Sequence, residues 1–231
     1  MPLNQYQQEV GPSLADARPG KMPDITLLDG RYCSVEHLTV AEHYEDILDF
    51  YFTNRILSDW TYMYADPFES EEAVRQCLED YEQSSNPYFF AIRDKASGKV
   101  LGTFSLMAIT PKNRSVEMGR VILAPALQKT RAATEAQYLV MTYVFDVLNY
   151  RRYEWKCDSL NHPSANAAQR LGFTFEGRFR NHAIYKGRSR DTDWFSIIDS
   201  EWPALKERFE NWLAPDNFDE NGPQKRSLRE C

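Results

Sequence analysis

The sequence predicts a single α/β (α+β) domain built on one twisted, mostly antiparallel mixed sheet that is flanked by helices. Three strand-like runs follow one another in the first half of the chain, and strand-like and helical runs alternate in the second half. No linker or internal repeat interrupts residues 23–213, so these residues are expected to form one domain. Residues 1–22 and 214–231 are polar and are expected to be N- and C-terminal tails.

The first elements are a short strand over residues 24–30 and an amphipathic helix over residues 39–52, whose apolar residues recur at helical spacing. The aromatic stretch 60–68 contains no regular pattern and is expected to be a loop. It leads into a helix over residues 70–83, because Ser70 is a good N-cap and two glutamates follow in the first turn.

Three strands are expected next, at residues 88–94, 100–109 and 115–124. The segment 94–99 has the composition of a hairpin turn between the first two strands. In the third strand the alternation breaks at residues 118–119, which is typical of a β-bulge.

Helices and strands alternate after this point. The order is a helix over 130–148, a strand over 152–160, a short helix over 163–172, strands over 173–187 and 191–199, and a closing helix over 201–213.

The helix that follows Thr130 has an unusual start. Thr130 is a reasonable N-cap, yet Lys129 and Arg131 flank it. A helix N-terminus is partly positive, so each cation there is unfavourable by roughly 0.3–1 kcal/mol. Two side chains that bend into solvent would explain the pattern. The functional alternative is a bound anion, because free N–H groups at a helix start bind phosphates and small residues (Ala132, Ala133) leave room for a ligand.

Composition and missing motifs exclude several functions. The net charge of −7 argues against a general nucleic-acid binder, and no apolar run reaches the ~18 residues of a membrane span. The sequence contains neither the P-loop motif G-x-x-x-x-G-K-[ST] nor the dinucleotide-binding motif G-x-G-x-x-G. The G-x-S-x-G motif of hydrolases is also absent. The four histidines and four cysteines lack metal-ligand spacing. Scattered cysteines and the absence of a secretory pattern at the N-terminus favour the cytoplasm.

Three stretches resemble one enzyme family. "ALQKTRAATEA" (126–136) is similar to the acyl-CoA-binding motif Gln/Arg-x-x-Gly-x-Gly/Ala of the GNAT superfamily of acetyl-CoA-dependent N-acetyltransferases. Gln128 fills its first position and Ala133 its last, while Arg131 stands where the family usually has Gly. "NHPSANAAQRLGFTFEGRFR" and "DTDWFSIIDSEW" resemble later segments of the family, the second in the branch that acetylates ribosomal-protein N-termini. The resemblance covers roughly residues 24–213.

The resemblance implies a GNAT-like fold whose sheet splays near residues 117–123 and 152–158 to admit acetyl-CoA as co-substrate. Loop amides would hold the pyrophosphate, with Lys129 and Arg131 as phosphate partners, and Asn161 would hydrogen-bond the pantetheine arm. The implied cofactor-binding residues are Val121, Ile122, Leu123, Gln128, Lys129, Thr130, Arg131, Ala132, Ala133, Thr134 and Asn161.

The resemblance also implies the catalytic groups. Glu117 is the candidate base, and its alternative is an outward-facing strand carboxylate. Ser164 is the candidate proton donor or contact of the thiol sulfur, and its alternative is a small residue of a helix start; Tyr185 is a second possible acid. The residues implied to bind the acceptor are Trp60, Tyr62 and Tyr64, which could instead anchor their loop in the core.

We therefore expect an acyltransferase that moves an acetyl group from acetyl-CoA to a primary amine, either a small molecule or a protein N-terminus. No metal, nucleic acid or membrane partner is expected. A catalytically silent acyl-CoA-binding module and an acyltransferase that uses another acyl donor remain as alternatives.

Overall fold

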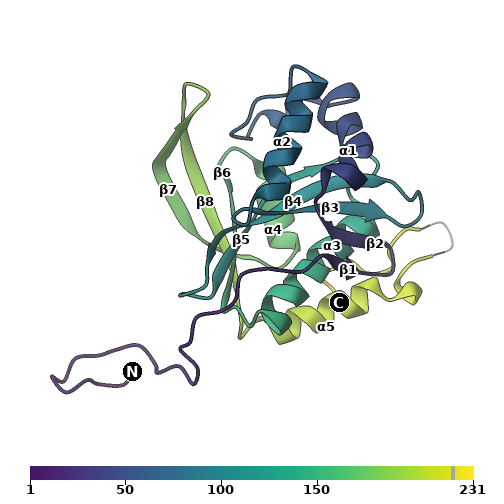
Figure 1. Cartoon of the computed structure of the whole chain (residues 1–231). Coiled ribbons are helices and arrows are strands. Elements are labelled where there is room, and N and C mark those ends of the chain that lie inside the picture. Colours follow the sequence, from purple (N-terminus) through teal and green to yellow (C-terminus); the bar gives the residue numbers. More distant parts are fainter. Residues whose placement is uncertain (220–221) are drawn as a thin grey trace.

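The computed structural model describes residues 1–219 and 222–231, and its centre is one eight-stranded sheet (Figure 1). The strand order is β1-β2-β3-β4-β5-β6-β8-β7, and every neighbouring pair is antiparallel except β5 and β6. The strands are β1 Leu27–Asp29, β2 Cys33–His37, β3 Tyr88–Asp94, β4 Val100–Thr110, β5 Ser115–Leu123, β6 Arg152–Asp158, β7 Thr174–Tyr185 and β8 Arg188–Ile198.

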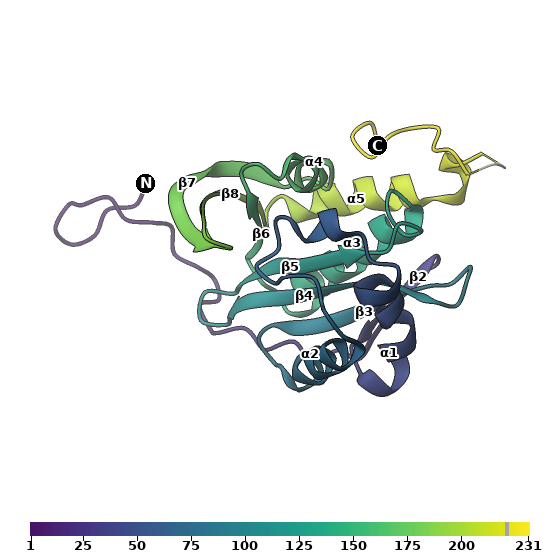
Figure 2. The ribbon, with the colours of Figure 1, turned by 90° about the horizontal axis from the view of Figure 1, so that it is seen from above.

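Helices cover both faces of the sheet. Figures 1 and 2 show α1 and α2 on one face and α3 with α5 on the other, while α4 lies against β6 and β7. The α-helices are α1 Val40–Leu48, α2 Glu71–Gln83, α3 Arg131–Thr142, α4 His162–Arg170 and α5 Trp202–Leu213. Single turns of other helix types lie at Asp49–Thr53, Leu57–Trp60, Tyr143–Val147 and Pro215–Asn217.

The predicted fold class is confirmed, and the element order is confirmed except at one strand. β2 was missed, because its five residues give too short a pattern to distinguish from a loop. The helix start at Ser70 is confirmed, since its hydroxyl oxygen accepts a hydrogen bond from the Ala73 N–H at 3.1 Å. The bulge in β5 lies immediately after the predicted position, where Arg120 has a φ of 52°.

The sheet opens between its two parallel strands. β5 and β6 pair from Ser115 with Arg152 up to Met118 with Trp155, and no further pairing follows. β5 nevertheless continues to Leu123 and β6 to Asp158. The strands therefore part at the position where the resemblance predicts a splay.

The two ends of the chain differ. The N-terminal residues form an arm that leads away from the domain (Figures 1 and 2) and that is largely exposed. The polar composition of residues 214–231 predicted a free tail, but within the described part Asn217, Phe218 and Leu228 are buried. This packing follows α5, whose Trp212 ring contacts the Phe218 ring at 5.1 Å.

Candidate functional site

Polar side chains alternate along β6 and β8 and occupy one face of the splayed half of the sheet. The register pairs Glu117 with Glu154, Lys156 with Trp194, and Asp158 with Thr192. Alternate residues of a strand share a face. We call this surface the polar face; its residues are Glu117, Glu154, Lys156, Asp158, Thr192 and Trp194. The intervening residues Tyr153, Trp155 and Cys157 point into the core.

Glu117 lies where β5 and β6 begin to part, and only 7% of it is exposed. Its Oε2 accepts a hydrogen bond from Lys156 Nζ at 2.7 Å, and the same ammonium contacts Glu154 at 2.9 Å. Burial raises the pKa of Glu117 above that of an ordinary glutamate, although Lys156 opposes the rise. Burial would lower the pKa of Lys156, but Glu117 and Glu154 outweigh it and raise the pKa. The arrangement holds a proton-accepting carboxylate beside a permanent cation.

Ser164 and Asn161 lie at the start of α4, just beyond the end of β6. Asn161 is the N-cap, and its Oδ1 accepts from the Ser164 N–H at 3.2 Å. The Ser164 hydroxyl oxygen accepts from the indole N–H of Trp155 at 3.0 Å. A hydroxyl can donate and accept at once, and Ser164 also hydrogen-bonds the thiol of Cys157, where it lowers the pKa that burial raises. The Asn161 Nδ2 group donates to no residue in the described part of the chain.

The turn before α3 presents free backbone donors. Thr130 caps the helix, since its Oγ1 accepts from the Ala133 N–H at 3.1 Å. Lys129 is exposed and has a φ of 61°. The N–H groups of Lys129, Arg131 and Ala132 meet no acceptor among residues 1–219 and 222–231. Free N–H groups at a helix start fit a phosphate group.

Arg131 does not extend toward these donors. Its guanidinium carbon lies 4.8 Å from the Tyr32 ring centre and 4.2 Å from the Phe218 ring centre. These contacts are cation–π interactions, which stabilise a cation without an anion. They explain why Arg131 can lie at the helix N-terminus without a bound anion. The contacts of Arg131 therefore do not support its predicted role as a phosphate partner.

The other predicted cofactor-binding residues lie around the same turn. The Gln128 side chain donates from Nε2 to the Leu123 carbonyl at 3.0 Å and thereby ties the turn to the end of β5. Thr134 is buried, and its Oγ1 accepts from Arg170 of α4 at 3.1 Å. Val121, Ile122 and Leu123 are half-buried at the end of β5 that does not pair with β6.

The aromatic loop bridges the two halves of the sheet. Trp60 is buried and packs against Tyr51 and Phe68, so it anchors the loop in the core. A small pocket that Trp60 shares with Ile122, Leu123 and six further residues places it near the end of β5. Tyr64 is exposed, and its ring lies 5.5 Å from that of Tyr185 on β7.

Tyr185 is poorly suited to act as an acid. Its hydroxyl donates to Asp158 Oδ2 at 2.8 Å. Burial, together with this carboxylate, raises the pKa of Tyr185 to about 12. Tyr62 is half-buried close enough to Tyr185 to contribute to that rise. The phenol therefore holds its proton more tightly than an ordinary tyrosine does.

The sequence reasoning missed Lys156 and Arg190. Polar residues alternate in "EWKCD", and that period of two could have identified the polar face. Nothing in the sequence pairs Lys156 with Glu117, because the contact depends on the parallel register of β5 and β6.

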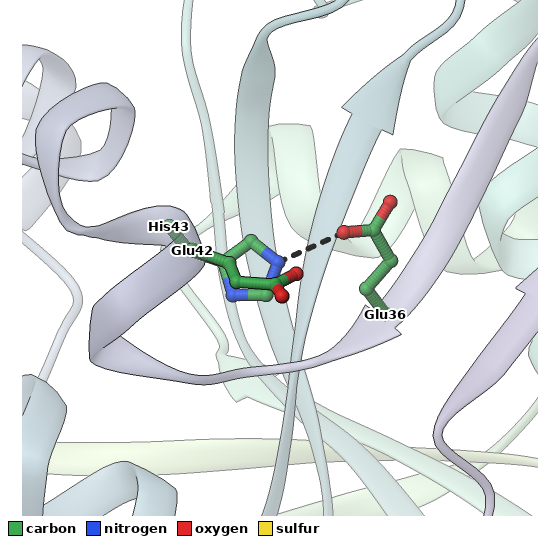
Figure 3. A group of neighbouring side chains, drawn as sticks. All are labelled: Glu36, Glu42 and His43. Carbon is green, nitrogen blue, oxygen red and sulfur yellow. Dashed lines mark hydrogen bonds and ion pairs between the residues drawn. The ribbon is translucent and has the colours of Figure 1, made fainter.

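A cluster outside this face consists of Glu36, Glu42 and His43 (Figure 3). Their ligand-type atoms lie within 4.8 Å of one another, which is a spacing that a metal ion could use. Glu36, however, accepts hydrogen bonds from both Arg93 and His43. Since Arg93 already neutralises the carboxylate, the cluster is an internal ion pair that ties α1 to the sheet.

An open hollow of about 730 Å³ over β7 contains none of the predicted residues.

Comparison with known proteins gives a consistent result. The model of the acetyltransferase (GNAT) domain matches residues 37–174. A crystal structure of a GCN5-related N-acetyltransferase from Brucella melitensis is 45% identical, covers 94% of this chain and 98% of that chain, and has a TM-score of 0.91. An N-acetyltransferase named p20 from Bacillus licheniformis is 30% identical over 61% of this chain and 80% of its own length. Spermidine N(1)-acetyltransferase from Escherichia coli K12 is 24% identical over 62% of this chain and 75% of its own length. No helix in the described part of the chain is long and apolar enough to cross a membrane.

Proposed function

The chain belongs to the GNAT acetyltransferases, and from this premise we propose that it transfers an acetyl group from acetyl-CoA to a primary amine. One observation carries the proposal. β5 and β6 part beyond Met118, one residue after Glu117, and a helix start with free N–H groups follows the open end of β5. A thioester held in the opening would have a carboxylate on one side and phosphate-binding groups on the other.

The residues fit the steps that this reaction needs. Acetyl-CoA supplies the activated acyl group. In the proposed reaction Glu117 accepts a proton from the amine, which is needed because an alkyl amine such as lysine has a pKa of ~10.4. A raised pKa makes Glu117 a stronger base than an exposed glutamate. Ser164 donates a hydrogen bond to the sulfur of the departing thiolate, which takes its proton from solvent, and Asn161 Nδ2 hydrogen-bonds the pantetheine arm. Lys129 and the free N–H groups of the turn hold the pyrophosphate.

Binding of acetyl-CoA is tested by thermal unfolding. A ligand that binds only the folded state adds RT ln(1 + [L]/Kd), or ~2.7 kcal/mol at a hundredfold excess over Kd. For a domain of this size we expect the melting temperature to rise by roughly 5–10 °C. No rise at millimolar acetyl-CoA would refute the proposed co-substrate.

Turnover is tested by thiol release in the presence of a panel of amines, with the products identified by mass spectrometry. A silent acyl-CoA-binding module would bind acetyl-CoA and release no thiol. An enzyme for another acyl donor would release thiol faster from that donor when the two compete.

The four cysteines have free thiols, which supports the proposal that the enzyme works in the cytoplasm.

A further inference from the structure

Arg190 on β8 is a buried cation near the proposed site that the reaction described above does not use. It is only 7% exposed. It lies two positions before Thr192 on β8, with one residue between them, so its side chain lies on the same side of the strand as the polar face. Its charge lowers the pKa of Glu117, of Cys157 and of Tyr185, so the guanidinium lies in the same part of the molecule as the proposed base.

Three other cations around this face have partly buried side chains and are paired with carboxylates. Arg152 pairs with Glu154 and Glu176, Lys156 pairs with Glu117 and Glu154, and Lys186 pairs with Asp66.

Arg190 differs, because no carboxylate oxygen in the described part of the chain lies within 4.0 Å of its nitrogens. A buried charge without a counter-ion is costly, so its retention calls for an explanation.

The contacts that Arg190 does make leave its outer edge free. Nε donates to Thr192 Oγ1 at 3.0 Å. The guanidinium carbon lies 4.9 Å from the Tyr64 ring centre and 5.6 Å from that of Tyr185. Rings bind the faces of the guanidinium plane, whereas its N–H groups point outward in that plane. Neither Nη1 nor Nη2 donates to a residue that the structure describes.

We propose that Arg190 binds a carboxylate of the acceptor, so that the substrates are primary amines that also carry a carboxylate. Examples are amino acids and peptides with an acidic group near the amine. The inference rests on the proposed acetyl transfer and specifies its acceptor. Two parallel N–H groups of a guanidinium match the two oxygens of a carboxylate. A polyamine would instead bring its cations toward an unneutralised arginine, which discriminates against that class.

Matched acceptors test this assignment. Amino acids from glycine to 6-aminohexanoate are compared with their own uncharged amides, and the dipeptide Ser-Glu with Ser-Gln; spermidine is included. A charged hydrogen bond contributes enough for a roughly 10- to 100-fold preference in kcat/KM. We expect that preference for the best carboxylate of the series over its amide. Arg190→Gln should abolish this preference, so that the carboxylate and its amide are acetylated with similar kcat/KM.

Two further variants complete the test. Arg188→Gln removes an exposed charge from the same hairpin and should keep the full preference. Arg190→Lys keeps the charge but not the paired N–H groups, and it should retain only part of the preference. The acetyl-CoA-induced rise in melting temperature shows that each variant is folded. If Arg190→Gln does not fold, the loss of preference in Arg190→Lys decides the question.

Three results would overturn the assignment. Equal turnover of carboxylates and amides by the unmodified protein rejects it and leaves acetyl transfer intact. An equal loss for all acceptors in Arg190→Gln shows that Arg190 merely clamps Tyr64 over the hairpin. Failure to acetylate any amine, without thiol release, rejects the proposed function itself and this inference with it.

Discussion

Replacing Glu117 with Gln separates base catalysis from cofactor binding. The substitution keeps the shape of the side chain and removes its ability to take a proton. General-base catalysis contributes 10²–10⁴-fold, or roughly 2.7–5.4 kcal/mol of transition-state stabilisation. We expect kcat to fall by this range, while the acetyl-CoA affinity stays within a few-fold because the phosphate-binding turn lies beyond the end of β5.

The surroundings of Glu117 indicate that the variant will fold. Lys156 keeps its contact with Glu154 at 2.9 Å, so its ammonium is not left without a carboxylate. The Gln side chain can still accept a hydrogen bond through its carbonyl oxygen. Loss of one charged hydrogen bond should lower the free energy of unfolding by about 1.5–3 kcal/mol. Thermal unfolding without acetyl-CoA measures this loss of stability, and thermal unfolding with acetyl-CoA measures whether the affinity is kept.

Glu154→Gln is the matched control. Glu154 lies beside Glu117 in the sheet and contacts the same ammonium, but it is also paired with Arg152. If Glu117 acts only by holding Lys156 in place, both variants should lose activity alike. If Glu117 is the base, only its own replacement should reduce kcat strongly. Initial rates of thiol release distinguish the two outcomes.

The pH profile adds an independent check. A base works only when deprotonated, and burial raises the pKa of Glu117. The rate should therefore fall with decreasing pH at values above the ordinary glutamate pKa of ~4.3. In Glu117→Gln the part of the profile that reports titration of Glu117 should be absent. The activity of this variant should rise only at high pH, where solution deprotonates the amine. Full activity of Glu117→Gln at neutral pH, or an equal loss in Glu154→Gln, would refute the assignment.

Four other substitutions give shorter tests. Ser164→Ala should lower kcat less than Glu117→Gln does, because a thiolate can leave unassisted; an equal or larger loss in the rate assay contradicts this. Ala133→Glu should abolish acetyl-CoA binding in calorimetry, since it puts bulk and negative charge at the helix start, and unchanged affinity counts against the predicted turn. Arg131→Gly should lower the melting temperature through lost ring contacts and change affinity little; a large gain in affinity would favour a silent module. Burial would raise the pKa of Glu36, but its hydrogen bonds lower it to about 2 from 4.5. Its stabilisation is thus present above pH 4.5 and lost as the pH falls toward 2, and Glu36→Gln should flatten that part of an acid-unfolding curve.

The fold could be predicted well because its elements carry local signals. Ser70 caps α2, and the strand "YFFAIRD" coincides with β3. β2 could not be recognised, because a five-residue strand is defined mainly by its neighbours β1 and β3. The packed C-terminal segment was missed for a related reason. Its polar composition resembles a tail, and the few apolar residues that attach its described part to the core, Phe218, Leu228 and Cys231, are widely spaced.

Candidate residues of the site could be named from the sequence, but their interactions could not. Glu117 and Ser164 flank the opening of the sheet, as the resemblance implies. The sequence could not show that Lys156 faces Glu117, since that contact spans 39 residues and requires the parallel register. Arg190 illustrates the same limit. Its lack of a direct ion pair is visible only in the structure, because it depends on where the carboxylates of the neighbouring strands lie.

The cations at the start of α3 show why one sequence pattern can have two physical causes. Both Lys129 and Arg131 are unfavourable beside a helix N-terminus, and a bound phosphate would explain both. The structure separates them. Arg131 rests on Tyr32 and Phe218, which lie far away in the sequence, so its position is stabilised without a ligand. Lys129 has no such contact in the described chain, is exposed and itself has a left-handed backbone conformation. We therefore expect the phosphate to be bound by Lys129 and the free N–H groups, and of the two cations Lys129 is the one whose removal should weaken acetyl-CoA binding.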